Sequence, residues 1–580
     1  MRPSHVLHRF IDRRRLVVQQ RISCPPGNRL LVSLIFAEIQ IGIVCEVDEA
    51  REDDIFDVAF WNILTESFVA VELRQQIYHE YFIVDGGYVY DGNSDILVQA
   101  DRKPISISLR YVCRSVAEET RTFPFKLNSI TFSTLYRKDL QHQAAIHSNL
   151  IRFHTVLLSE LLLRMRYFVT PEMFDQVEEV APHYIQVMKS RIDDCIGYDR
   201  VFQPVDFATI ANFDNEACLT RADLSWNDNT VGFQRAIVCI LRQINVKNAA
   251  DIAEAIKEVL PGWTDSSSPE QLFDMLFDHW DIPSLSCLRE AAERLQRHRF
   301  LESLGNWHRV QDNDSGFLDV RYKGPRYRYR RKYWFSATAV AIRFLKRLSS
   351  TQRGYLHNLV LNEDKISVGF PESHAIGMIP FCKERPTAYR LINMYFERSE
   401  PEAGELYSID EIDGPDQDFY FTNWVVNGLE VVKAGMPPGS WSVVFDGEPD
   451  LNLATDLFTK LLKRTIVWHT FYNDCVSLGL FTNPIHPDYP FATVTSDGRA
   501  LERKRSSIFQ CNFNLDRPWN LDEIAADNNI HKEEDGGRLS FWLGRVNLDY
   551  QPFGFCVSSP TVDIRKLRLS CFEREKISDD

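Results

Sequence analysis

Apolar residues recur at helical spacing in two short stretches, residues 71–82 and residues 106–120. In each stretch the apolar positions form one stripe and charged side chains occupy the opposite face, which predicts an amphipathic helix. A polar, glycine-rich turn region separates the two helices, and residues 128–132 favour a strand. The stripe residues are Leu73, Ile77, Tyr78 and Phe82 in the first stretch and Leu109, Val112, Cys113 and Val116 in the second.

The same periodicity continues through residues 139–305 and predicts an all-helical block. Helix starts are marked by a capping residue followed by proline, at Thr170-Pro171 and at Ser268-Pro269, and Ser284 begins a further helix. Leucine-rich faces indicate that these helices pack against one another. The expected helices cover residues 139–168, 172–196, 231–246, 249–260, 270–280 and 284–305.

Beyond residue 305 short strand and helix patterns alternate, and we expect residues 306–569 to form a mixed α+β domain. Ser336 is placed to cap a helix that ends at Leu348. The acidic stretch 397–418 contains prolines and glycines and favours a solvated loop. Strands are expected at residues 355–362 and 441–445, and a long helix at 453–478.

These patterns together define the expected organisation of the chain. Its fold class is α+β and predominantly helical, with a small N-terminal helical unit, an all-helical middle block and a mixed α/β C-terminal half. The expected parts are a poorly ordered leader at 1–65, the helical unit at 66–138, the helical block at 139–305, the α+β domain at 306–569 and a frayed tail at 570–580.

Composition sets bounds on the class of protein. A chain of 580 residues is too long for one core, and about 150 residues per domain predicts two to four domains. Hydrophobic residues make up 44%, enough for packed cores, and the formal charge of -15 argues against a general polyanion binder. The twelve cysteines form no C-x-x-C pair, which is typical of reduced, mostly buried thiols in an intracellular protein, cytoplasmic or nuclear.

The N-terminal residues allow three interpretations. Residues 1–24 are rich in arginine and almost free of acids, like a mitochondrial presequence. An unstructured leader, or sequence that does not belong to the folded protein, is favoured. The apolar run 30–45 is too short to span a bilayer and contains Glu38, so no membrane segment is expected.

An Arg/Tyr-rich segment at 321–332 is the sharpest candidate for binding. On an extended chain, alternating arginines and tyrosines present cations on one face and rings on the other, which suits phosphate contacts and base stacking. The favoured interpretation is an exposed β-ribbon whose tyrosines face the core and whose arginines meet the acidic stretch 397–418. The polyanion-binding candidates are Arg326, Arg328, Arg330 and Arg331.

Signals for catalysis, cofactors and metals are weak. Asp91, Asn93 and Asp95 imitate the start of a calcium loop, but Ile96 and Arg102 stand where such a loop needs glycine and glutamate, so a turn is expected. Phosphate-binding glycine motifs and nucleophile elbows are missing from the sequence. Cys382 is expected to be a buried thiol. We therefore predict no catalytic, cofactor-binding or metal-binding residues and a protein that is not an enzyme.

Five segments of the chain resemble parts of a known family. The run VELRQQIYHEYF, followed by LRYVCRSVAEETRTFPFKLNSITF, resembles the opening of F-box-like proteins of filamentous ascomycete fungi. Val69-Ala70 stands where members of that family carry Leu-Pro. The segments KYWFSATAVAIRFLKRL, LHNLVLNEDKISVGFPESHAIGMIPFC and PPGSWSVVFDGEPDLNLATDLF resemble later parts of the same family.

The resemblance implies a protein that works by binding another protein. Its F-box-like unit would dock on the Skp-type adaptor of a cullin–RING ubiquitin ligase, with Leu73, Ile77 and Val112 as docking positions. Four functions stay open at this point. They are an intracellular interaction protein, which is favoured, a substrate adaptor of a cullin–RING ligase, a nucleic-acid binder acting through residues 321–332 and, last, an enzyme without a recognisable motif.

Overall fold

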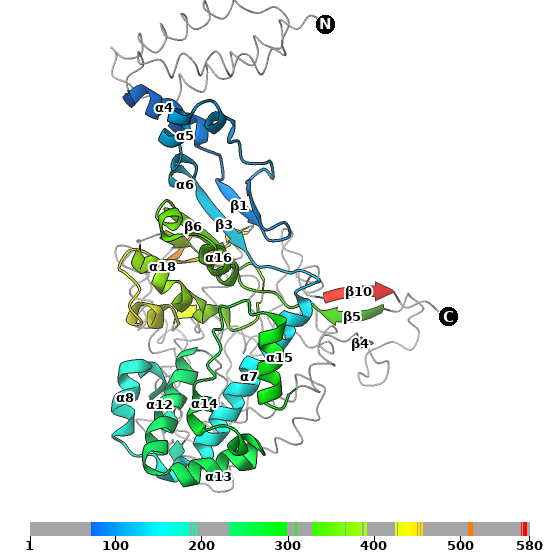
Figure 1. Ribbon diagram of the computed structural model, residues 1–580, viewed down its shortest axis with the longest axis vertical. Helices are drawn as coiled ribbons and strands as arrows, with labels where there is room; N and C mark the ends of the chain where they lie inside the picture. The colour runs from blue at the N-terminus through cyan, green and yellow to red at the C-terminus, as the bar shows by residue number, and fades with distance from the viewer. Residues whose placement is uncertain are drawn as a thin grey trace, which may run out of the picture. The chain divides into compact units, whose positions relative to one another are not determined.

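The computed structural model divides into two compact units, one formed by residues 1–83 and 105–127 and the other by residues 84–104 and 128–580 (Figure 1). The residues that it describes are 71–185, 188–189, 192–193, 196, 231–297, 308–309, 327–365, 367–384, 388–390, 424–425, 427–448, 450–452, 454–455, 508–513, 570 and 572–576.

The first unit is a set of short helices around its own core. Its elements are α4 (Val71–Phe82), the 3₁₀ helix η1 (Ser108–Tyr111), α5 (Arg114–Glu119) and α6 (Phe123–Leu127). Tyr78, Phe82, Leu109 and Val116 are buried together, so the apolar stripes predicted from the sequence face one another. The second predicted helix is interrupted, because η1 ends before α5 begins at Arg114.

The second unit contains the predicted helical block, with α7 (Gln141–Arg164) at its centre (Figure 1). Helices α12, α13 and α15 all contact α7, which is buried on every side. Its buried residues include polar ones, such as His147, Asn149 and His154, beside the leucines. The other elements are η2 (Arg166–Phe168), α8 (Met173–Val180), η3 (Pro182–Tyr184), α12 (Val231–Lys247), α13 (Ala249–Val259), η4 (Trp263–Asp265), α14 (Pro269–Phe273) and α15 (Leu285–Arg294).

A five-stranded sheet forms the other main part of the second unit. The strand order is β2-β1-β3-β6-β7, in which β1, β3, β6 and β7 run parallel and β2 is antiparallel to β1. The four parallel strands therefore follow one another in chain order, and β2 is added at the outer edge of β1. The bounds are β1 (Tyr88–Asp91), β2 (Ile96–Gln99), β3 (Ser129–Ser133), β6 (Asn358–Asn362) and β7 (Ala388–Arg390).

Helix α16 (Ala337–Lys346) covers one face of this sheet and contacts β3 and β6. Phe344 of α16 lies against Tyr90 and Phe132, with ring centroids 5.5 and 5.4 Å away. Gly87 turns the chain into β1 with φ of +70°, and a Cβ atom there would lie 2.5 Å from the carbonyl oxygen of Ser129. Only glycine permits this close approach of β1 to β3.

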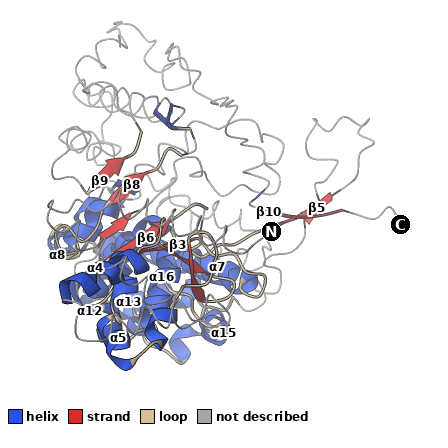
Figure 2. Ribbon diagram, turned by 90° about the horizontal axis from the view of Figure 1, so that it is seen from above, coloured by secondary structure: helices blue, strands red, loops and turns tan. Residues whose placement is uncertain are grey.

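Two smaller sheets and several short helices complete the described part of the second unit. Strands β8 and β9 pair in parallel and lie side by side in Figure 2. Strand β5 lies between β4 and β10 in an antiparallel sheet. The bounds are β4 (His308–Arg309), β5 (Tyr327–Arg331), α17 (Ser350–Arg353), η6 (Pro371–Met378), α18 (Ile379–Glu384), β8 (Val443–Phe445), β9 (Phe509–Cys511) and β10 (Phe572–Lys576).

The coarse fold class is confirmed, because the described residues form a helix-rich mixture of helices and small sheets. Several local expectations are corrected, and the expected helices 270–280 and 284–305 end at Phe273 and at Arg294. The polar region 84–104 carries β1 and β2 rather than turns alone, and residues 572–576 of the expected frayed tail form β10. The expected unit 66–138 is shared between both units. The leader 1–65, the acidic stretch 397–418, the apolar run 30–45 and residues 456–478 lie outside the described residues.

None of the helices in the described ranges has the length and apolar character needed to cross a bilayer.

Candidate functional site

The Arg/Tyr-rich segment becomes strand β5, and its arginines meet acids on β10. Arg328 Nε donates to Glu575 Oε2 at 2.7 Å, and Arg330 Nε donates to Glu573 Oε2 at 2.9 Å. The Tyr136 hydroxyl donates to the same Glu573 carboxylate. The acidic partner of these two arginines is therefore the C-terminal strand; the stretch 397–418, expected to fill that role, lies outside the described residues.

Charge pairing lowers the availability of this strand for polyanions. Burial raises the pKa of Glu573, but hydrogen bonds from Tyr136 and Arg330 outweigh burial and hold the pKa below its ordinary value. The Glu573 side chain therefore stays ionised. The Arg331 guanidinium lies 5.0 Å from the Tyr333 ring centroid, and Arg326 lies outside the described residues.

The three docking candidates lie in the first unit. Ile77 and Val112 are partly buried and pack against the core of that unit. Leu73 belongs to α4, and its side chain is outside the described set. Next to Val112, Tyr111 is 79% exposed, and Ile107 is 38% exposed. Of the described side chains, the exposed ones Tyr111 and Ile107 thus lie beside Val112, which is itself partly buried.

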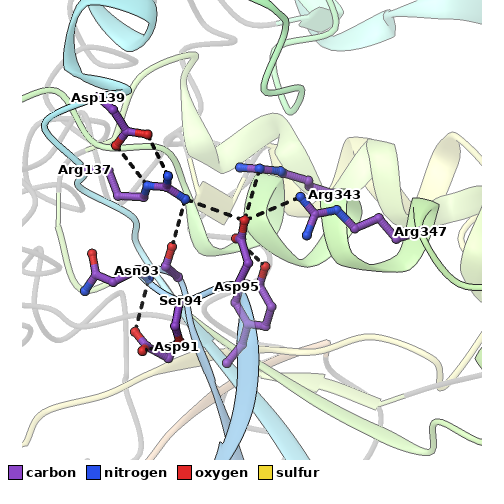
Figure 3. Close-up of polar contacts among 10 residues, drawn as sticks. Asp91, Asn93, Ser94, Asp95, Arg137, Asp139, Arg343 and Arg347 are labelled. Atoms are coloured by element: carbon purple, nitrogen blue, oxygen red, sulfur yellow. Dashed lines mark hydrogen bonds and ion pairs between the residues drawn. The ribbon is translucent and has the colours of Figure 1, made fainter.

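A further polar cluster forms where the parallel strands end (Figure 3). The turn after β1 supplies Asp95, the segment after β3 supplies Arg137, and α16 with its C-cap supplies Arg343 and Arg347. Because parallel strands all end at the same edge of a sheet, residues distant in sequence meet there. Open parallel sheets bind their ligands outside this carboxyl edge, usually where the strand order reverses. In this sheet the chain passes from β1 to β2 on one side and then to β3 on the other, so the strand order reverses at β1, and loops and α16 build the site there.

Asp95 is the centre of this cluster. Its Oδ2 atom lies 3.6 Å from Arg137 Nη1, 3.5 Å from Arg343 Nη2 and 3.6 Å from Arg347 Nη2. Its Oδ1 atom accepts a hydrogen bond of 2.8 Å from the Tyr90 hydroxyl. Partial burial raises the pKa of Asp95, but Tyr90 and the three guanidinium groups together bring it below its ordinary value. Asp95 is therefore a carboxylate at neutral pH.

The failed calcium-loop pattern has a structural explanation. Asp91 Oδ1 accepts from the Asn93 backbone N–H at 3.1 Å, and Asp91 Oδ2 accepts from the Ser94 hydroxyl at 2.6 Å. Asp91 therefore stabilises the turn that sends the chain into β2. The described residues contain no group of three or more His, Cys, Asp or Glu side chains arranged to hold a metal ion.

A hydroxyl–imidazole pair is completely buried at the start of α16. Ser336 Oγ accepts from the Ala339 backbone N–H at 2.9 Å and lies 2.7 Å from His374 Nδ1. His374 Nε2 lies 2.7 Å from the Gly369 carbonyl oxygen, which can only accept, so Nε2 carries the proton and Ser336 donates to Nδ1. Both side chains are 0% exposed. The pair caps a helix and lies out of reach of a substrate.

Glu363 completes this cap. Its two carboxyl oxygens accept from the backbone N–H groups of Ala337 and Thr338, at 2.9 and 3.0 Å. Burial raises the pKa of Glu363 to about 7. Carboxylates at a helix N-terminus satisfy donors that have no partner within the helix.

The described cysteines correct one expectation and match another. Cys382 is buried, as expected. Cys113, Cys239 and Cys511 are partly exposed and Cys287 is exposed, so the described thiols are not mostly buried.

Sequence reasoning missed the arginine cluster. Asp95 was singled out only as a calcium-loop position, and Arg137 lies in a connecting segment without periodicity. The one available signal was the spacing of Arg343 and Arg347, four residues apart on one helix, where like charges oppose each other unless an anion lies between them. Comparison of the chain with protein-family models, with curated proteins and with solved structures found no match.

Proposed function

We propose that the protein is a non-enzymatic, intracellular interaction protein whose helical first unit docks another protein. The observation that carries the proposal is the exposure of Tyr111 and Ile107 on a small unit that already has a complete core. Exposed tyrosines supply large apolar contact area with little entropy cost on binding, and they are enriched at protein interfaces.

The first unit is suited to hold such a surface rigidly. Glu119 accepts from Arg74 Nη2 at 3.1 Å and from the Tyr78 hydroxyl at 3.0 Å, which ties α5 to α4. The Tyr81 hydroxyl lies 2.8 Å from both Ser106 Oγ and Ser108 Oγ and fixes the start of η1. Tyr111 and Ile107 therefore project from a segment that hydrogen bonds hold in place. Little conformational entropy would be lost there when a partner binds.

Affinity purification with two matched variants tests this proposal. The I107S/Y111S double variant should lose the partner proteins that the unchanged chain captures, with a drop of about tenfold or more per partner. Y167S is the control, because Tyr167 is 59% exposed but belongs to the second unit, and it should capture the same partners. Equal capture by I107S/Y111S and the unchanged chain would contradict the proposal.

The resemblance to F-box-like proteins supports a sharper alternative, in which the partner is the Skp-type adaptor of a cullin–RING ubiquitin ligase and the second unit presents the substrate. Titration of the purified adaptor onto the full chain distinguishes the two. Saturable binding that I107S/Y111S removes would favour the ligase role. If the adaptor does not bind while other partners are still captured, the ligase role is excluded and only the general interaction role remains.

Nucleic-acid binding through residues 321–332 has less support. Nucleic-acid binding would require arginines that can contact phosphates. Arg328 and Arg330 each pair with a glutamate of β10 instead.

A further inference from the structure

We infer that Arg137, Arg343 and Arg347 form a binding site for the phosphate group of a small phosphorylated molecule, and that Asp95 is the carboxylate with which the phosphate competes. This inference concerns the carboxyl edge of the sheet in the second unit and is independent of the partner docking proposed for the first unit.

The three guanidinium groups are arranged around a single point. All three converge on one oxygen, Asp95 Oδ2, at 3.5–3.6 Å. Direct hydrogen bonds between charged nitrogen and oxygen measure about 2.7–2.9 Å, so none of the three engages the carboxylate closely. The three planar guanidinium groups therefore surround one carboxylate oxygen without a close hydrogen bond to it. A phosphate group offers several oxygens and matches such groups in shape.

The positive charges of this cluster outnumber the negative charges among the described residues. Among the described residues, Asp95 is the one acid within ion-pair distance of Arg343 and Arg347. Arg137 is shared between Asp95 and Asp139, whose Oδ1 accepts from Arg137 Nε at 3.0 Å (Figure 3). Three guanidinium groups thus face two carboxylates, and one positive charge is in excess. A phosphomonoester carries about −1.5 to −2 at pH 7 and would neutralise this excess.

The side chains of this cluster are accessible to solvent. The side chain of Arg347 is 46% exposed, that of Arg343 28% and that of Asp95 30%, so an anion from solvent can reach the point of convergence. Partial burial also lowers the local dielectric constant and strengthens the attraction compared with a fully exposed pair. The position outside the carboxyl ends of β1 and β3 is the side of a parallel sheet at which ligands bind.

Inorganic phosphate is the first probe, measured by thermal unfolding of the full chain at constant ionic strength with chloride as reference. The melting temperature should rise with phosphate and saturate in the millimolar range, because a ligand that binds only the folded chain stabilises it. R347Q should weaken the apparent affinity at least fivefold, and R343Q/R347Q should remove the saturable shift. D95N should tighten binding, because the competing carboxylate is gone.

R242Q is the matched control. Arg242 is 49% exposed and paired with Asp274 on the surface of the helical block, so its loss should leave the phosphate shift unchanged. If R343Q/R347Q does not fold, the R347Q variant alone tests the site, because the Arg347 side chain is half exposed at the end of α16. A phosphate effect no larger than that of chloride, or an equal effect in R347Q, would overturn the site. A phosphopeptide bound about tenfold more tightly than both phosphate and phosphoserine would overturn the small-molecule assignment.

Discussion

Four histidines of the second unit are completely enclosed and carry no charge in the folded chain. Burial lowers the pKa of His147 and His154 to about 4 each and that of His374 to about 3, and it holds the pKa of His279 well below its ordinary value. In the unfolded chain these imidazoles take up a proton near pH 6.5. Between about pH 4 and 6.5 the unfolded state therefore binds more protons, and stability should rise with pH.

Glu363 opposes this trend. Its pKa of about 7 in the folded chain exceeds its value of 4.5 when unfolded, so its contribution is complete below pH 4.5 and is lost as the pH rises through 7. Four imidazoles outweigh one carboxyl, and the net free energy of unfolding should increase from pH 4.5 to 6.5.

Urea unfolding at pH 4.5, 5.5 and 6.5 measures this pH dependence. His154→Gln should flatten it, because one buried imidazole no longer titrates; the loss of a shift from 6.5 to about 4 corresponds to about 3 kcal/mol at low pH. A variant with the same pH dependence as the unchanged chain would show that His154 takes up its proton without unfolding.

Ser336 has two roles, so its removal should cost more than the loss of a cap alone. Ser336→Ala removes the N-cap of α16, worth about 1 kcal/mol, and leaves His374 Nδ1 buried without a donor, at about 1–3 kcal/mol more. We expect a loss of about 2–4 kcal/mol in urea unfolding. Ser349→Ala is the control, because Ser349 caps α17 in the same way but on the surface, and it should cost about 1 kcal/mol or less.

The sequence predicts local partnerships of this kind and misses distant ones. Ser268 and Ser336 were expected to cap helices, and each accepts from a backbone N–H three residues ahead, as does Ser284, where a helix was expected to begin. Thr170 was also expected to cap a helix, but the N-cap of α8 is Glu172, without a side-chain hydrogen bond. Capping depends on neighbours within one turn, so a short window contains its cause. The contact of Ser336 with His374 spans 38 residues and leaves no periodic trace in the sequence.

At the level of elements, the pairing of β5 with β10 predicts how the C-terminal strand affects polyanion binding. Deletion of residues 571–580 removes the glutamates that pair with Arg328 and Arg330, so these arginines should contribute more to phosphate contacts. Two added contacts should steepen the dependence of log affinity on log salt by about one to two, measured with single-stranded RNA.

A shorter deletion, of residues 577–580, is the matched control. The longer deletion removes four acids and two bases, and the shorter removes two acids, so both remove a net two negative charges. Only the longer one removes Glu573 and Glu575. Equal salt dependence of the two deletions would mean that β10 does not mask the arginines.

Strand β10 also shows why element prediction fails for some segments. Phe572–Lys576 is mostly charged and carries no alternating apolar pattern, so the sequence favours a frayed end. The strand forms because its glutamates lie opposite the arginines of β5, and opposite charges across two strands stabilise the pair. Helices such as α12 and α13 have internal apolar stripes, and their ends were predicted within one residue.

For the whole molecule, the two units should lose structure separately. Leu109→Ala opens a cavity in the first core and should cost that unit about 2–5 kcal/mol. Hydrogen exchange should then accelerate in residues 71–83 and 105–127 and stay unchanged in β3 and β6. Leu359→Ala, in β6, should have the converse effect. Simultaneous loss of protection in both regions would show that the units fold as one.

This division could not be predicted from the chain. The two helical stripes of residues 71–82 and 106–120 predict a small core correctly, because both lie within one short segment. The hairpin between them, residues 84–104, belongs to the second unit, since β1 pairs with β3. The cluster of Asp95 with Arg137, Arg343 and Arg347 depends on the same long-range pairing. The sequence around Asp95 therefore does not predict that these arginines lie beside it.

The sequential strand order also has a consequence during synthesis. Strand β3 pairs with β6 through Ser129 and Asn358, positions that are 358 − 129 = 229 residues apart. At about 5–20 residues per second, a ribosome needs about 10–50 s to make that interval. Through this time one edge of β3 has no strand beside it, while the helical block emerges and folds. An open edge of this kind pairs readily with other chains, so β3 is where a nascent copy of this protein most needs a chaperone.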